Sequence, residues 1–373
     1  MKISIHKGVL LEPLMKVSIG TSSKNVLPIL SGILFLVDND DLTLVSGDTS
    51  FFIKTKIPAV DFKIIKPGGI IIPAKEITGV IKRMPDKIID IEADGTSVRI
   101  SSGKTKMMLR GLESEMFPVL PDEPKEHYLQ IPGKDLKELI RMTSFAVYKK
   151  EDFPIGTGIK ISFSDSGLKF TACDRNRFAI VTDTARSEIE GEVVISADNM
   201  HKISSTITDG DTITMSQNES MMIIESKKYT MYSKMLEGKY PPIERLLDST
   251  EYAFANCRKS DVIEALERSM ITAEKNEQGG FVVRLSLIGN EIGIQSENNN
   301  YEQTQDFVET ESASGGKIIV GINGKYMLEA LKALKDDIIK IRFAGEGKPI
   351  VISNGDEDMA MYLIALYRLR EAS

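Results

Sequence analysis

The chain has 373 residues, of which 42% are hydrophobic and 27% are charged, with a formal net charge of −7 and two cysteines. This composition is typical of a folded globular protein rather than a disordered or collagen-like one. Two cysteines cannot form a disulfide framework, and no apolar run reaches the roughly 18–20 residues that cross a bilayer. The N-terminal residues alternate like a strand and lack the apolar stretch of a signal peptide. We therefore expect a cytoplasmic protein of two or three domains, away from membranes.

In chain order, the first third of the sequence predicts two helices and a series of short strands. Apolar residues three or four positions apart mark the helices, one around residues 10–17 and one around residues 77–84. Alternating apolar residues, bounded by Asp, Asn and Gly, predict strands joined by hairpins. These strands are expected at residues 33–37, 42–48, 50–57, 88–92, 97–101 and 106–110.

The rest of the sequence repeats this order twice. Helical stripes recur at residues 136–140, 200–207, 262–270 and 327–334. One strand of each third ends in an acid, at Asp48, Asp174 and, more weakly, Glu297. A period above 100 residues is too long for a solenoid unit, whose period is about 20–50 residues, but long enough for a complete domain. We therefore expect three copies of one domain, at residues 1–126, 127–248 and 249–373, with Pro-rich joints between them.

Strand-rich repeats with two amphipathic helices each predict an α+β fold, in which the helices lie on one face of antiparallel sheets. The six expected helices carry 14 Lys and Arg against 9 Asp and Glu, so they hold +5 while the remaining residues hold −12. Such a basic surface could bind the phosphates of a nucleic acid in a salt-dependent way. Helices also commonly carry solvated Lys and Glu, so both interpretations stay open.

Catalytic and metal-binding motifs are not recognisable. Residues 345–349 resemble part of a phosphate loop but lack its full spacing, and a strand follows. The three histidines show no metal-ligand spacing. Asp48 and Asp174 are interpreted as repeated strand ends rather than a catalytic pair, and Cys173 has no clear histidine partner. We expect no enzyme, no metal and no cofactor.

The whole chain nevertheless resembles the bacterial DNA sliding clamp family, the beta subunit of DNA polymerase III. The most specific segments are Lys-Asn-Val-Leu-Pro-Ile-Leu-Ser-Gly at 24–32, Ile-Pro-Ala-Lys at 72–75 and Glu-Met-Phe-Pro at 115–118. Further matches lie at 174–179, 237–241, 323–326 and 362–369. The resemblance implies three clamp-type domains that form half of a ring. Two copies would join head to tail, encircle double-stranded DNA and tether a polymerase for processive synthesis.

The resemblance also implies site residues. Contacts to DNA phosphates are expected from Lys24, Lys75, Lys149 and Lys150, whereas Asp198 stands where the family tends to be basic. For the homodimer it implies that Met107 and Leu109, on an edge strand, meet Ile271 of the partner subunit. An apolar pocket for short linear peptides of polymerase and clamp-loader subunits is expected from Ile155, Cys173, Arg177, Phe178, Pro241, Arg245, Leu246, Asn323, Tyr326, Leu363, Ile364, Leu366, Tyr367, Arg368 and Leu369.

Two segments of this expected pocket depart from the family pattern. The family usually has Asp-Gly-His-Arg where this chain has Asp-Arg-Asn-Arg at 174–177. It has Met-Pro-(Met or Val)-Arg-Leu where this chain has Ala-Leu-Tyr-Arg-Leu at 365–369, and four more residues follow. Arg175 and Tyr367 are bulky replacements, so they predict an altered peptide preference. The alternative hypothesis is a repeat-built scaffold that binds peptides and has no role on DNA.

Overall fold

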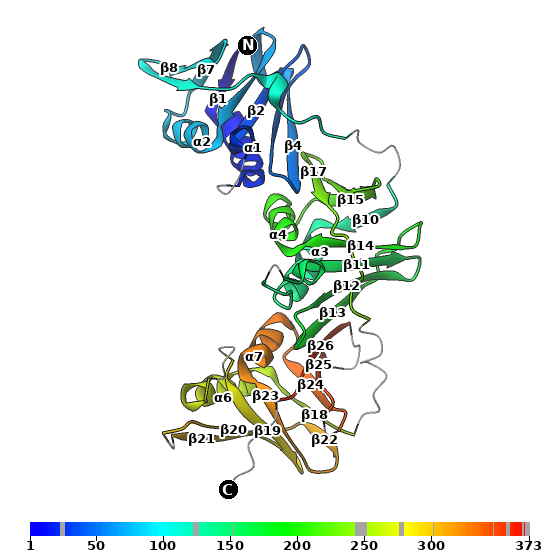
Figure 1. The fold of residues 1–373 in the computed structure, drawn as a ribbon. Helices are drawn as coiled ribbons and strands as arrows, with labels where there is room; N and C mark the ends of the chain where they lie inside the picture. The colour runs from blue at the N-terminus through cyan, green and yellow to red at the C-terminus, as the bar shows by residue number, and fades with distance from the viewer. Residues whose placement is uncertain are drawn as a thin grey trace. The chain divides into compact units, whose positions relative to one another are not determined.

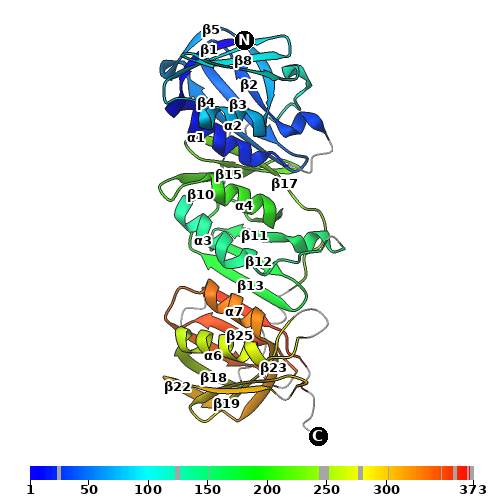
Figure 2. The ribbon, with the colours of Figure 1, turned by 90° about the vertical axis from the view of Figure 1, so that its left-hand side faces the viewer.

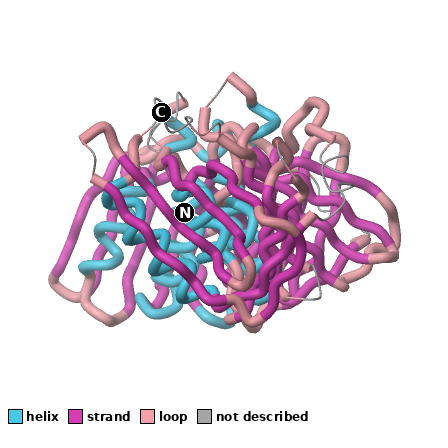
Figure 3. The backbone as a smooth tube through the Cα atoms, turned by 90° about the horizontal axis from the view of Figure 1, so that it is seen from below, coloured by secondary structure: helices cyan, strands magenta, loops and turns pink. Residues whose placement is uncertain are grey.

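The computed structural model of the chain describes residues 1–22, 27–121, 127–150, 152–242, 252–275, 280–300, 302–345, 347–355, 359–367 and 369. Strands predominate over helices in these residues (Figure 3). They form four sheets in which the recorded strand pairs are antiparallel, and six α-helices accompany them within the described ranges. The chain divides into two compact units, Met1–Lys137 with Asp198–Met235, and Glu138–Ala197 with Leu236–Ser373.

The first unit holds a five-stranded sheet, in the order β5-β1-β7-β8-β9, and an eight-stranded sheet, in the order β10-β15-β16-β17-β4-β3-β2-β6. Its helices are α1 (Lys7–Val17), α2 (Ala74–Arg83) and nearly all of α4 (Ala197–Thr206). The strands are β1 (Lys2–His6), β2 (Gly32–Val37), β3 (Asp41–Gly47), β4 (Phe51–Pro58), β5 (Phe62–Lys66), β6 (Gly68–Pro73), β7 (Ile88–Asp94), β8 (Ser97–Ser102), β9 (Thr105–Arg110), β10 (Leu129–Pro132), β15 (Thr212–Gln217), β16 (Met221–Glu225) and β17 (Tyr229–Lys234).

The second unit holds a nine-stranded sheet, in the order β14-β11-β12-β13-β26-β25-β24-β18-β22, and a four-stranded sheet, in the order β21-β20-β19-β23. Its helices are most of α3 (Gly133–Ser144), α6 (Lys259–Thr272) and α7 (Gly324–Ala333). The strands are β11 (Gly158–Ser164), β12 (Gly167–Cys173), β13 (Arg177–Asp183), β14 (Gly191–Ser196), β18 (Ala253–Arg258), β19 (Val282–Ile288), β20 (Glu291–Glu297), β21 (Gln303–Glu309), β22 (Ser312–Gly315), β23 (Ile318–Asn323), β24 (Ile338–Phe343), β25 (Ile350–Asn354) and β26 (Ala360–Ile364).

Strand pairing joins each third of the sequence to the next. In the eight-stranded sheet β4 of the first third pairs with β17 of the middle third (Figure 1). In the nine-stranded sheet β13 of the middle third pairs with β26 of the last third. Because each ladder continues across a joint, the compact units cut through the middle third instead of following the sequence repeat. The three domain ranges expected from the repeat remain a prediction.

The apolar residues expected along one side of each helix pack into the cores. Helix α1 buries Leu10, Leu14 and Val17, lies beside α2, and packs on β3 and β4 (Figure 2). Helix α6 lies beside α7 and packs on β20 and β21. Each stripe matches the 3.6-residue period, which places one apolar side of the helix against a sheet and leaves the other side polar. The helices predicted from periodicity are therefore confirmed.

The three copies also share backbone hydrogen bonds. At the start of the first helix in each third, an amide donates to the carbonyl before the strand that follows the second helix. The three bonds are Lys7 N to Lys87 O at 3.0 Å, Gly133 N to Asp211 O at 2.8 Å and Lys259 N to Asp337 O at 2.8 Å. An equivalent bond in each third confirms a repeat of structure as well as of sequence.

The repeated acids at strand ends build turns. The Asp48 carboxylate accepts hydrogen bonds from the amides two and three residues later, at 2.8 and 2.9 Å. Asp174 does the same at 3.2 Å for both amides. Side chains of this length satisfy turn amides in this way, which explains the repeated aspartates structurally. In the last third Glu297 ends β20, but the turn is made by Asn298, one position later than the acid singled out in the sequence.

Candidate functional site

A basic cavity of about 450 Å³ lies in the second unit, lined by the loop after α3, the turn before β13 and the start of α7. Two tyrosines, Tyr148 and Tyr326, contribute aromatic surface to its lining. Five cationic side chains line it against two carboxylates, so its local charge is strongly positive. The cations are Lys149, Lys150, Arg175, Arg177 and Lys325, and the carboxylates are Asp174 and Glu329.

Arg177 is held inward by three hydrogen bonds. Its Nε donates to Asp174 at 2.7 Å, one Nη donates to Glu329 of α7, and the other donates to the Phe145 carbonyl at 2.7 Å. Its guanidinium also lies 4.3 Å from the centroid of the Tyr326 ring, and the residue is only 4% exposed. Burial raises the pKa of the Asp174 carboxyl, and the nearby Arg177 offsets only part of that rise. Arg177 therefore ties the middle third to α7.

The corresponding joint in the first unit uses a different ion pair. There Asp48, at the turn before β4, accepts a hydrogen bond from Lys202 of α4 at 2.5 Å. Burial raises the pKa of Asp48, but the hydrogen bonds from Lys202 and Ser50 outweigh it and leave the pKa below its ordinary value. In the second unit the equivalent helix, α7, supplies an acid, Glu329, instead of a lysine. Two carboxylates, those of Asp174 and Glu329, then need a cation between them, and Arg177 pairs with both.

Arg175 lies at the edge of the cavity in an unusual backbone conformation. Its φ is +75°, and it is the one non-glycine residue with positive φ among those described. The guanidinium lies 4.9 Å from the Tyr148 ring centroid and 5.9 Å from that of Phe153, and it pairs with Asp152 at 3.5 Å. Positive φ is uncommon for residues with a Cβ, so the surrounding structure must hold this turn in place.

At position 175 we expect glycine to give a more stable protein than alanine, the reverse of their usual order. Both changes remove the contacts with Tyr148 and Phe153, but only glycine adopts φ of +75° without steric cost. We expect Arg175→Gly to be more stable than Arg175→Ala by about 1 kcal/mol, measured as the difference in urea-induced unfolding of the second unit. An alanine variant at least as stable as the glycine variant would show that the turn relaxes to negative φ.

An apolar cluster lies beside the cavity. Its buried members are Ile155, Cys173, Ile180, Val194, Tyr240, Val351 and Leu363. Partly buried Phe153 and Phe178 pack against this apolar cluster, and Phe153 also lies under Arg175. Three side chains predicted for the peptide pocket, Ile155, Cys173 and Leu363, are thus gathered with Phe178. Burial raises the pKa of the Cys173 thiol, which favours the neutral form and a packing role.

The end of the described chain joins the last sheet. Ile364 of β26 lies opposite Arg177, and Tyr367 donates its amide to the Gly321 carbonyl at 2.8 Å. A Cβ at Gly321 would lie 2.6 Å from the Tyr367 carbonyl, so this close approach requires glycine. The Asn323 amide group donates to the Tyr367 hydroxyl at 3.4 Å, and its oxygen caps α7.

The other residues predicted for the pocket lie partly inside and partly outside the described ranges. Leu366 is half-buried, and Pro241 is half-buried next to Tyr240. The Leu369 side chain lies against Gly321. Arg245, Leu246 and Arg368 lie outside the described residues. Of the predicted set, Arg177, Asn323 and Tyr326 thus line the cavity, and Ile155, Cys173, Phe178 and Leu363 belong to or pack on the apolar cluster.

The lysines predicted to meet DNA occupy two places. Lys75 is exposed in the first turn of α2, and Lys149 and Lys150 are exposed at the basic cavity. Lys24 lies outside the described residues. Their role on DNA remains a prediction.

The residues predicted for the dimer lie at or near the edges of two sheets. Met107 (41% exposed) and half-buried Leu109 belong to β9, at one edge of the five-stranded sheet. Ile271 (81% exposed) lies on α6, which packs on β21 at an edge of the four-stranded sheet. Sequence reasoning missed Phe307 of β21, which is also exposed, although its place in a strand of alternating residues was a usable signal.

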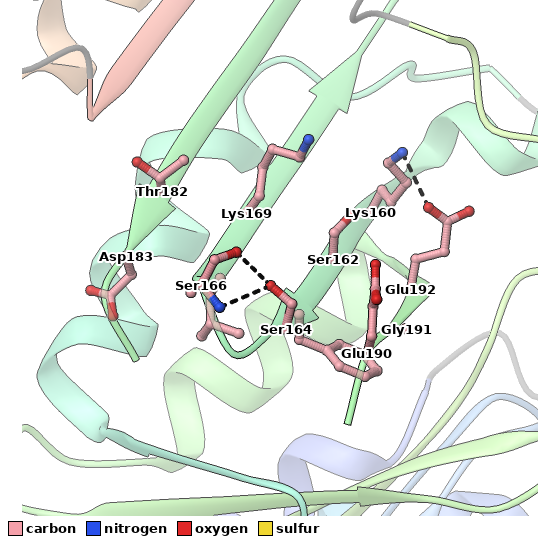
Figure 4. A pocket seen from close by; sticks show the side chains of 13 residues that line it. Lys160, Ser162, Ser164, Ser166, Lys169, Thr182, Asp183, Glu190, Gly191 and Glu192 are labelled. Carbon is pink, nitrogen blue, oxygen red and sulfur yellow. Dashed lines mark hydrogen bonds and ion pairs between the residues drawn. The ribbon is translucent and has the colours of Figure 1, made fainter. Parts of the chain in front are cut away.

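A second cavity, of about 550 Å³, lies over β11, β12 and the start of β14 (Figure 4). Lys160 points toward Glu192, with 3.4 Å between their charged atoms, and the Ser164 and Ser166 hydroxyls lie 2.7 Å apart. Two pairs of its polar side chains are thus bonded to each other, and none of the predicted site residues lines it.

Sequence profiles of the DNA polymerase III beta subunit match three consecutive segments: the N-terminal domain at residues 1–121, the central domain at 130–242 and the C-terminal domain at 246–368. The chain belongs to the DNA polymerase III beta subunit family. In that family it is a divergent member, built of three clamp-type domains with an α+β fold.

Individual relatives of this beta subunit family cover the whole chain. The beta sliding clamps of Halalkalibacterium halodurans and Bacillus subtilis are 27% and 28% identical to it, over 99% and 98% of the chain and 100% and 98% of their own lengths. The crystal structure of the DNA polymerase sliding clamp from Bacillus subtilis superposes with a TM-score of 0.95, at 27% identity, over 99% of this chain and 100% of that one. In the described ranges, none of the helices has the length and apolar character needed to cross a bilayer.

Proposed function

We propose that this chain is a DNA sliding clamp. Two copies join head to tail into a ring that encloses duplex DNA and tethers the replicative polymerase and other partners through short peptides. The observation that carries the proposal is the family match across all three thirds, with full-length similarity to proteins named beta sliding clamps. The clamp has no catalytic step of its own, takes no cofactor, and works in the cytoplasm where the DNA is copied.

A ring that encloses DNA needs only weak binding from the protein surface that faces the DNA. A closed ring stays on DNA without tight binding, so weak phosphate contacts are enough and let the ring slide along any sequence. Exposed lysines such as Lys75, Lys149 and Lys150, together with Lys24, suit this role because they offer flexible point charges without base recognition.

Two sheet edges support head-to-tail closure. Within the chain, strand pairing already joins the first third to the middle third and the middle third to the last. The edge strands β9 and β21 have one recorded neighbour each, so β9 of one copy could pair with β21 of the other. Strand β9 carries Lys106 and Arg110, whereas β21 carries Asp306 and Glu309, so the two edges are complementary in charge. A closed symmetric dimer would also protect edges that otherwise risk aggregation.

The partner-peptide site is proposed at the apolar cluster and the adjoining basic cavity. Partly buried Phe153 and Phe178 offer apolar surface beside it, and Asn323 and Tyr326 supply polar and aromatic groups nearby. Peptide sites combine an apolar anchor with a few well-placed polar groups, which is the combination found here.

Topological retention on DNA tests the clamp function. After loading by a cognate clamp loader, the protein should remain on a nicked circular plasmid through gel filtration. It should be lost when one restriction cut makes that plasmid linear, because a ring then slides off the ends. The same plasmid before cutting is the matched control. Equal retention on circular and linear DNA would indicate ordinary binding, and no retention on either would favour the peptide-binding scaffold without a role on DNA.

A further inference from the structure

We propose that the basic cavity, with Arg175 at its edge, selects an acidic side chain in the partner peptide. The peptide's apolar residue would lie beside Phe153 and Phe178, and a nearby Asp or Glu would place its carboxylate at Arg175 and Lys325. This inference rests on the proposed function, since it assumes that partners bind through short peptides at this site. It adds the chemical class of the peptide that this clamp prefers.

The charges that line the cavity favour an anionic ligand. The two carboxylates that line it, Asp174 and Glu329, both bond to buried Arg177. The other four cations, at 149, 150, 175 and 325, are exposed and face the cavity without a lining carboxylate of their own. Positive charge concentrated in a cavity attracts an anionic ligand and raises its local concentration.

Arg175 has an acidic neighbour that a ligand can replace. Asp152 lies 3.5 Å from its guanidinium, and both side chains are about 60% exposed. Exposed ion pairs of this kind contribute little stability, because water solvates both ions and screens the attraction. A peptide carboxylate that bonds to two guanidinium nitrogens at once would form the stronger contact.

The Arg175 side chain is oriented before any ligand arrives. It lies over Tyr148 and Phe153, and its φ of +75° holds the turn in a conformation that few residues adopt. Backbone strain persists where the surroundings enforce it, and such positions are common at functional sites. A side chain that is already oriented loses less conformational entropy when it binds.

The same residue links the cavity to the apolar cluster. Phe153 packs against the apolar cluster on one side and lies under the Arg175 guanidinium on the other. An apolar residue beside Phe153 would therefore bring a neighbouring carboxylate within reach of Arg175. One short peptide can therefore contact both the apolar cluster and the basic cavity.

The aromatic rings of the cavity favour a peptide over single-stranded nucleic acid. Proteins that bind single strands offer aromatic faces on which bases stack. Here Arg175 covers one face of the Tyr148 ring and Arg177 covers one face of the Tyr326 ring, at 4.9 and 4.3 Å from the ring centroids. The cavity thus offers more cationic donors than open stacking surface, which suits a carboxylate.

Matched peptides test the proposal on the full-length protein. Three fluorescein-labelled peptides would share one Leu-Phe anchor and carry Glu, Gln or Lys at the flanking position. We expect the Glu peptide to bind about tenfold more tightly than the Gln peptide, as one charge-assisted contact would provide. Arg175→Glu should abolish this preference and favour the Lys peptide, whereas Lys317→Ala, an exposed lysine before β23, should leave it unchanged. Near-ultraviolet circular dichroism would verify that each variant is folded.

The outcomes separate the inference from the proposed function. Equal binding of the Glu and Gln peptides to the unchanged protein would overturn the inference and leave the peptide site standing. Binding of none of the peptides would overturn the inference together with the peptide site. Displacement of the Gln and Glu peptides alike by an oligo-dT strand, lost in Arg175→Glu, would identify a nucleic-acid site and also overturn it.

Discussion

Replacing Arg177 by methionine is expected to lower the free energy of unfolding of the second unit by about 3–5 kcal/mol. Arg177 is 4% exposed and bonds to the carboxylates of Asp174 and Glu329 and to the Phe145 carbonyl. Methionine fills much of the same volume but leaves a buried and a half-buried carboxylate without their cation. Native-state hydrogen exchange of β13 and α7 amides, with calorimetry, would measure the loss.

A triple variant separates charge from packing. Asp174→Asn and Glu329→Gln, added to Arg177→Met, remove every charge of the network together. Asn can still accept the two turn amides that Asp174 now accepts, so the turn survives. We expect the triple variant to recover at least half of the stability lost in Arg177→Met, because no unpaired charge remains buried. Equal losses in both variants would show that packing of the arginine, rather than its charge, holds the joint.

Acidic residues at Met107 and Leu109 are expected to convert the proposed dimer into monomers. Both lie on the face of β9 that continues the buried face of β8, opposite Ile100 and Val98. Pairing with a second copy would extend this apolar layer toward Ile271 of the partner subunit. Loss of two apolar contacts of about 1.5–3 kcal/mol each would raise the dissociation constant roughly 10²–10⁴-fold. Added negative charge would also face the acids of β21.

Sedimentation velocity would follow this change across a concentration series. The matched control is Ile65→Asp with Val60→Asp, which places two acids at or just before β5, the other edge of the same sheet. The control should sediment like the unchanged protein. A dimer that persists with both β9 acids would refute the assignment of this edge, and monomers in the control as well would indicate general destabilisation of the sheet.

Local periodicity explains why much of the fold was predictable. Apolar stripes such as Leu10, Leu14 and Val17 specify helix faces from neighbouring residues alone, and the same pattern recurs in each third. The edge position of β9 also followed from the sequence, through the family resemblance, and the structure places β9 at an edge. The repeat was hardest to recognise in the last third of the sequence, because the turn there depends on Asn298 instead of the acid before it.

Several residues of the candidate site were expected from the sequence, but their arrangement was not predictable. Arg177 and Tyr326 were both expected at a peptide pocket, yet the guanidinium lies over that ring and bonds inward to Glu329. No pattern near Arg177 reveals a carboxylate 152 residues away in sequence. The arginine at 175 does not by itself indicate positive φ, but the glycine that the family usually has at this position was a usable signal for it.

The sequence by itself determined the threefold repeat, the helices and strands of each copy, and the family, since these depend on short-range patterns and matching segments. Only the tertiary structure decided that sheets continue across the joints, that Arg177 is buried between two acids, and that Arg175 faces a basic cavity. The physical reason is distance along the chain. Pairing of β4 with β17, or of Arg177 with α7, depends on long-range packing that brings remote residues together, and neighbouring residues do not encode it.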